Sequence, residues 1–117
     1  MKINGLELNV EPGADLSYAD LSSADLSGVD LHGANLRGAN LCDVNLSGAN
    51  LSGAILARIT AHNADLSGAN LTGAKIPQGH LENANFSNAN LTGANLNRAW
   101  LNGSNFSDAD CSEAEFF

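Results

Sequence analysis

The sequence has few basic, cysteine and aromatic residues, and the first two shortages each exclude a class of protein. Five Lys and Arg stand against 13 Asp and Glu, and the formal charge of −8 disfavours direct binding to nucleic acid or to an anionic membrane. Cys42 and Cys111 lie too far apart in the chain to suggest a disulfide framework, which favours a reducing compartment. The first ten residues, MKINGLELNV, contain no apolar run, so we expect no signal peptide. No stretch of the chain approaches the length of a transmembrane helix, so we expect none and a cytoplasmic location.

Aromatic residues make up only 5% of the chain, whereas Asn, Ser and Gly are abundant, a composition that low-complexity disorder shares. The strict placement of Leu and Ala argues against disorder. In the stretch ANLRGANLCDVNLSGANLSGA, leucines recur every fifth residue at Leu36, Leu41, Leu46 and Leu51. Five residues advance an α-helix by about 500°, and an odd spacing alternates the faces of a flat strand, so neither element could gather these leucines on one side. The backbone must therefore turn a corner once per repeat, and the repeats must stack to bury their apolar face.

The five-residue phase continues without interruption from Leu16 to Phe116. Most central positions are Leu, and most positions two residues earlier are Ala. Variants at the central position are Ala61, Ile76, Phe86, Phe106, Cys111 and Phe116. Ala61 is the smallest of these, and the large Ile59 two residues before it compensates for the lost core volume.

The run ANLRGANLCDVNLSGANLSG resembles the pentapeptide repeat family, whose pattern is A(D/N)LXX, and the match covers residues 14–117. The resemblance implies an all-β fold, a right-handed quadrilateral parallel β-helix with four repeats per coil and about five coils. Residues 1–13 would form an N-terminal cap, a strand or irregular segment over the first coil, which Pro12 and Gly13 end. In such a fold residues 20 apart stack, with the Leu and Ala positions pointing inward.

The residue two places after each central position is often Gly, which suits the third residue of a type II turn, where φ is positive. Where another residue stands there, we expect a different turn. Those residues are Ser23, Asp43, Arg58, Gln78, Arg98 and Glu113. Asn63, Asn83 and Asn88 fit either conformation.

The acidic residues do not predict a metal or catalytic site. Aspartates occupy one position on each of the four sides of the first coil: Asp15, Asp20, Asp25 and Asp30. The second coil would place an Asn beneath each of them, so like charges would not stack and the four carboxylates would point apart. His32, His62 and His80 point outward; His62 and His80 could be neighbours, but only Cys42 suggests itself as a third ligand. We therefore expect no catalytic residue, no metal, no cofactor and no enzymatic activity.

Sorting the outward residues by side predicts one distinctive face. Every basic residue within the repeats falls on the side centred on Leu16, Leu36 and Leu56, and the next side adds histidines and the single Trp. Arginine and exposed aromatic residues are typical of protein interfaces. The candidate partner-binding face comprises Arg37, Ile55, Arg58, His62, Lys75, His80, Arg98 and Trp100.

These residues favour a non-enzymatic β-helical scaffold that binds another protein, whose identity the sequence does not specify. Some pentapeptide repeat proteins resemble double-stranded DNA in shape and charge and inhibit type II topoisomerases, and this acidic rod could be such a mimic. An enzyme or metal-binding protein is a distant alternative. At the C-terminus, Phe116 and Phe117 either plug the last coil or form an apolar end that pairs with a second copy in an end-to-end homodimer.

Overall fold

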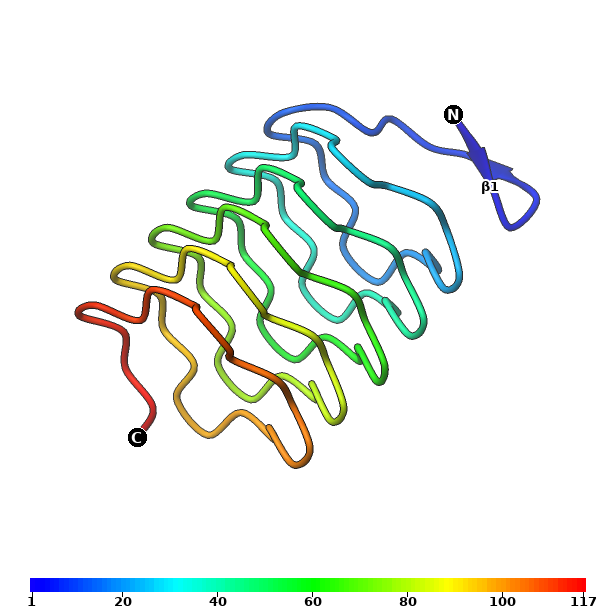
Figure 1. Cartoon of the computed structure of the whole chain (residues 1–117). Coiled ribbons are helices and arrows are strands. Elements are labelled where there is room, and N and C mark those ends of the chain that lie inside the picture. The colour runs from blue at the N-terminus through cyan, green and yellow to red at the C-terminus, as the bar shows by residue number, and fades with distance from the viewer.

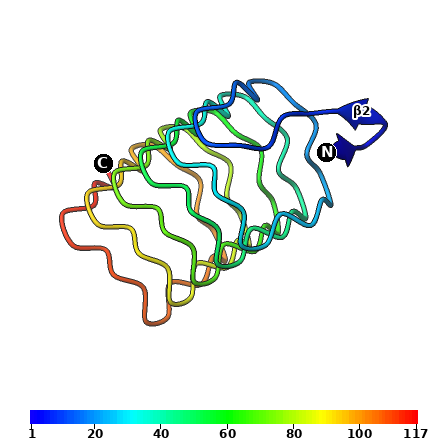
Figure 2. The ribbon, with the colours of Figure 1, turned by 90° about the horizontal axis from the view of Figure 1, so that it is seen from above.

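The computed structural model describes all residues from 1 to 117, and most of the chain winds into a stack of similar coils (Figure 1). Single-residue parallel bridges connect residues 20 apart, from Asp15 with Asn35 to Asn95 with Glu115. The 20-residue register expected from the sequence is therefore confirmed, and it places four pentapeptides in each coil. Seen from above, successive coils lie side by side along one axis (Figure 2).

Each pentapeptide contributes one bridged residue rather than a continuous strand, because a tight turn follows immediately. In the first repeat, the amide of Leu16 donates to the carbonyl of Asn35 at 2.7 Å, and the amide of Ala19 donates back to the carbonyl of Leu16 at 3.1 Å. The same pair of bonds recurs along the chain. The backbone therefore turns a corner in every repeat, as the five-residue period requires.

The only extended strands are β1 (Lys2–Ile3) and β2 (Leu6–Glu7), which pair as an antiparallel hairpin at the N-terminal end. Ile3 is buried in the core, while Leu6 is exposed. The side-chain amide of Asn4 donates to the carbonyls of Asp20 and Ser22, both at 3.1 Å, which ties the hairpin to the first coil. No helix in the structure is long and apolar enough to cross a membrane.

The core consists of the central residues and the residues two places before them, as expected, and no polar side chain is buried in it. Ile59 and Ala61 are both fully buried, consistent with their complementary volumes. Gly79 adds a second adjustment, since a Cβ there would lie 3.0 Å from Ile76 and 3.5 Å from Ile59. Phe86 and Phe106 stack in adjacent coils with ring centroids 4.7 Å apart.

The expectation of different turns at the non-glycine positions is wrong. Every residue two places after a central position, from Tyr18 to Glu113, has a positive φ. Arg58, for example, has a φ of 58°, although left-handed backbone disfavours residues with a Cβ. The amide of Arg58 donates to the carbonyl of Pro77 at 3.0 Å, and equivalent bonds connect the other corners to the next coil. The stacking of coils therefore determines the turn, whatever residue occupies it.

Candidate partner-binding face

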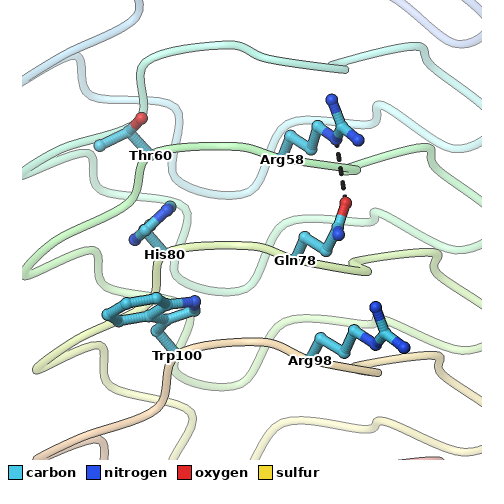
Figure 3. Close-up of a pocket in the computed structure, with 6 residues that line it drawn as sticks. All are labelled: Arg58, Thr60, Gln78, His80, Arg98 and Trp100. Carbon is cyan, nitrogen blue, oxygen red and sulfur yellow. Dashed lines mark hydrogen bonds between the residues drawn. The ribbon is translucent and has the colours of Figure 1, made fainter.

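Part of the predicted face forms a shallow hollow of about 560 Å³, which we call the basic–aromatic groove. One of its walls is a column of long polar side chains, and the other is a column that ends in an aromatic ring (Figure 3). Its lining residues are Arg58, Thr60, Gln78, His80, Arg98 and Trp100. Four of these, Arg58, His80, Arg98 and Trp100, belong to the predicted face. Gln78 lies between Arg58 and Arg98, and Thr60 lies one coil before His80.

The backbone fixes both walls of the groove. Thr60, His80 and Trp100 follow one another through parallel bridges, so their side chains leave the surface at successive coils. On the opposite wall, the Nε of Arg58 donates to the Oε1 of Gln78 at 2.9 Å. The indole of Trp100 lies over the imidazole of His80, with ring centroids 5.0 Å apart, and remains 56% exposed. The groove thus presents guanidinium groups and an open aromatic surface side by side.

The three residues of the polar wall have an unfavourable, left-handed backbone conformation. Arg58, Gln78 and Arg98 have φ values of 58°, 58° and 60° in consecutive coils. Each such residue costs roughly 1–2 kcal/mol relative to right-handed backbone. At the other corners the non-glycine residues are Ser, Asp and Asn, except for Glu113 and for Tyr18, which has a φ of 61° in the same column two coils before Arg58. Asn and Asp tolerate this conformation better, and the groove is where three long side chains occupy such corners in consecutive coils.

The remaining residues of the predicted face lie outside the groove. Ile55 and Lys75 bridge to each other in a neighbouring column. Arg37 lies closer to the N-terminal end, where its Nε donates to the hydroxyl of Tyr18 at 3.3 Å. The Tyr18 ring itself covers Gly38, since a Cβ at that glycine would overlap the ring. Four of the eight predicted residues therefore line the groove, and the other four lie around it.

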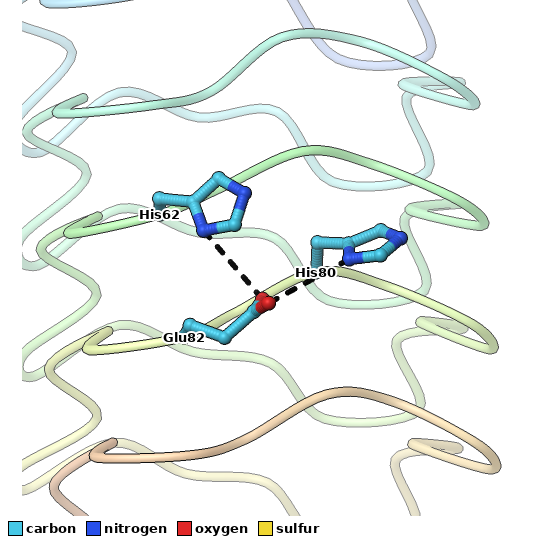
Figure 4. A group of neighbouring side chains, drawn as sticks. All are labelled: His62, His80 and Glu82. Atoms are coloured by element: carbon cyan, nitrogen blue, oxygen red, sulfur yellow. Dashed lines mark ion pairs between the residues drawn. The ribbon is translucent and has the colours of Figure 1, made fainter.

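His62 and His80 are neighbours, as the sequence suggested, with ring centroids 6.1 Å apart. The third side chain beside them is that of Glu82 (Figure 4), whereas Cys42 is not part of this cluster. Sequence reasoning missed Glu82, although it lies 20 residues after His62 and so had to stack directly on it. These three side chains could hold a metal ion.

The first-coil aspartates, Asp15, Asp20, Asp25 and Asp30, stack on asparagines as expected. Their carboxylates accept hydrogen bonds within their own repeats: Asp15 accepts from the hydroxyl of Ser17 at 2.6 Å and from its amide at 3.1 Å. These bonds, from the side chain first and the backbone second, lower the pKa of each aspartate from its usual value of 3.8. Asn45 makes the same pair of bonds to Ser47, so the aspartates act as local turn caps.

At the C-terminal end, Phe116 packs edge-on against Phe106, with ring centroids 6.1 Å apart, and Phe117 is 86% exposed. Cys111 packs against the core as expected, and its burial raises the pKa of its thiol. Both cysteines are free thiols.

The chain belongs to the pentapeptide repeat family. The family model for pentapeptide repeats matches residues 13–43, 45–83 and 78–108, with eight copies of the repeat unit. This confirms the resemblance found in the sequence. No curated protein sequence matches the chain.

Several solved structures are similar to the chain. HetL, a pentapeptide repeat protein involved in heterocyst differentiation regulation from the cyanobacterium Nostoc sp. strain PCC 7120, is 29% identical over 89% of this chain, with a TM-score of 0.41. The chain spans 64% of the length of HetL. A pentapeptide repeat protein from the thylakoid lumen of Arabidopsis thaliana is 33% identical over 91% of this chain and 67% of its own, with a TM-score of 0.34. QnrB1, a plasmid-mediated fluoroquinolone resistance protein, is 25% identical over 95% of this chain and 69% of its own, with a TM-score of 0.47.

Proposed function

We propose that the chain is a non-enzymatic scaffold of about five right-handed β-helical coils that binds an acidic segment of another protein in the basic–aromatic groove. The observation that carries this proposal is the retention of Arg58, Gln78 and Arg98 at left-handed backbone positions in consecutive coils. Backbone strain at a defined place suggests function when nothing local relieves it. The strained side chains here supply donors to a shared hollow.

The chemistry of the groove supports an acidic partner. The chain carries a net charge of −8, yet two of its five basic side chains line this one hollow. A guanidinium can form two parallel hydrogen bonds to one carboxylate, and an exposed Trp is a frequent anchor at protein interfaces. The hydrogen bond between Arg58 and Gln78 holds one guanidinium in place before a partner arrives. Family membership supports the scaffold role, because pentapeptide repeat proteins are generally not enzymes.

The charge pattern weighs against the alternative of a DNA mimic. Such a mimic requires continuous negative potential along one surface of the rod. Each first-coil aspartate stacks on an Asn in the next coil, and Asp65 lies between Asn45 and Asn85 in the neighbouring coils. The negative charges are therefore interrupted along the axis. QnrB1 shares the repeat with this chain, and topoisomerase binding remains an outcome for the experiment to detect.

The test uses Trp100, the only tryptophan of the chain, as a fluorescent probe inside the groove. We would titrate the protein with a Glu-rich peptide and, in parallel, with a Lys-rich peptide of equal length. We expect a saturable change in Trp100 emission with the acidic peptide only. Arg98→Glu should weaken binding about tenfold, equivalent to roughly 1.4 kcal/mol.

The matched control is Arg37→Glu, which makes the same charge change outside the groove. An equal loss of binding in both variants would mean that net charge, and not the groove, controls binding. Affinity capture from cell lysate with the wild type and with Arg98→Glu would then identify the natural partner. If the wild type and Arg98→Glu captured topoisomerase subunits equally well, the result would reject binding in the groove and favour DNA mimicry.

A further inference from the structure

The cluster of His62, His80 and Glu82 lies beside the groove and has a geometry of its own. The Nδ1 of His62 is 3.6 Å from Oε1 of Glu82, and the Nδ1 of His80 is 3.8 Å from Oε2 (Figure 4). Both separations exceed the 2.7–3.2 Å of a protein N–H···O hydrogen bond. The carboxylate therefore lies between two imidazole nitrogens without a hydrogen bond to either.

The same chain shows what a bonded histidine–carboxylate pair looks like. The Nδ1 of His32 is 2.8 Å from Oδ1 of Asp30, an ordinary hydrogen bond on an exposed turn. Glu82 differs in a second respect. Its Oε1 is buried and has no hydrogen-bond partner. A buried carboxylate oxygen without a partner is costly, which implies that something other than a protein donor satisfies it.

We propose that His62, His80 and Glu82 bind a divalent transition-metal ion, with Zn²⁺ as the best fit. One ligand atom from each side chain lies within 4.8 Å of the others. Ligands about 2.1 Å from a tetrahedral Zn²⁺ are roughly 3.4 Å apart. The shortest separations here, 3.6 Å from His62 to Oε1 and 3.8 Å from His80 to Oε2, are close to that value, although they involve the two different oxygens of Glu82. Small side-chain rotations of the three residues would bring one ligand atom from each to these distances.

The ligand set selects the class of metal. Two imidazoles and one carboxylate suit Zn²⁺ and its neighbours in the transition series. Ca²⁺ needs six to eight oxygen ligands, and Mg²⁺ retains several waters around one or two carboxylates, so both should bind poorly here. The imidazoles of His62 and His80 are 42% and 40% exposed, which leaves room for a water as the fourth ligand.

The coil backbone holds the three ligands in place. The carbonyl of His80 accepts a bond from Ala61 at 2.7 Å, and the carbonyl of Glu82 accepts one from Asn63 at 3.0 Å. Both bonds tie the coil of His80 and Glu82 to the coil of His62. The Trp100 ring also packs on the His80 imidazole, with ring centroids 5.0 Å apart. The site is therefore largely preformed.

Two measurements on the untagged protein test the proposal. Isothermal titration calorimetry with Zn²⁺ should give one ion per chain, whereas Ca²⁺ should give no signal. Ni²⁺, which is paramagnetic, should quench Trp100 because the indole contacts the ligand His80. Glu82→Gln removes the carboxylate charge and preserves the shape, and it should weaken Zn²⁺ binding by more than the roughly tenfold that loss of an outer-shell partner costs.

The matched control is His32→Ala, which removes an exposed histidine from the other histidine–carboxylate pair. It should leave Zn²⁺ binding and Trp100 quenching unchanged. The proposal is overturned if the wild type fails to bind Zn²⁺, or if Glu82→Gln and His62→Ala bind it as tightly as the wild type. Unchanged circular dichroism and melting of the variants would exclude unfolding as the cause of any loss. Because Glu82 and His62 do not line the groove, these variants leave the test of peptide binding independent.

Discussion

Replacing Arg98 by Gly should stabilise the protein and impair its binding to an acidic partner. Arg98 has a φ of 60°, and its side chain lines the groove. Relief of the left-handed strain contributes roughly 1–2 kcal/mol. The greater conformational freedom of Gly in the unfolded chain reduces this gain in stability by about 0.5–1 kcal/mol. The net gain is therefore about 0–1.5 kcal/mol, and the middle of that range corresponds to a rise in Tm of roughly 2–4 °C for a chain of this size.

The assay is thermal unfolding followed by circular dichroism, alongside peptide binding followed by Trp100 fluorescence. Arg37→Gly is the control, since Arg37 does not have a positive φ and Gly there brings only its entropic cost and the loss of the bond to Tyr18. We expect Arg37→Gly to lower Tm and Arg98→Gly to raise it. A lower Tm for Arg98→Gly would refute the idea that its backbone is strained. A higher Tm with unchanged peptide affinity would separate that strain from function.

Three further predictions follow from the core, the turn caps and the chain end. Leu46→Asp places a charge in the fully buried core and should abolish cooperative unfolding in circular dichroism; a retained transition would contradict the register of the coils. The first-coil aspartates have lowered pKa values in the folded state, so their stabilisation is present above pH 3.8 and is lost as the pH falls through the folded pKa. Replacing all four by Asn, which caps the same turn in other repeats, should preserve the fold and flatten the decrease in Tm below pH 4; an unchanged decrease would assign it to other carboxylates. If the exposed Phe117 pairs with a second copy, sedimentation of the 117-residue chain should show a dimer that Phe117→Ser converts to monomer, whereas a wild type that is monomeric at every concentration rejects the end-to-end arrangement.

The coil could be predicted from the sequence because the same five-residue period sets both the position of each turn and the position of each core residue. Leu at every fifth residue required a corner per repeat, and the 20-residue stacking placed each first-coil aspartate on an asparagine as the structure shows. The N-terminal cap was predicted as a segment over the first coil, but its hairpin was not. Only one of its apolar residues, Ile3, is fully buried, so hydrophobic periodicity over so short a segment carries little information.

The errors have a common physical origin, which is contact between coils. The turn at Arg58 was expected to differ because local propensity disfavours a positive φ, yet the amide bond to Pro77 in the next coil imposes it. Glu82 was not predicted beside His62, because their contact follows from the 20-residue register and not from local spacing. In both cases the information was available in the stacking register. Local preferences alone did not contain it.

In a β-helix of this kind, residues 20 apart stack in columns along the axis, whereas neighbours in sequence point in different directions. A surface site therefore consists of residues from adjacent columns. Gln78 and His80 stand two residues apart on opposite walls of one groove, and each finds its partners in adjacent coils. The groove and the histidine cluster share His80 and span residues 58–100, in the same three successive coils. The left-handed arginines also fall within this segment. Elsewhere the corners are mostly Gly, Asn, Asp or Ser, residues that suit the turn itself. This part of the surface therefore departs most from what folding alone would favour, and that departure is the strongest reason to place binding there.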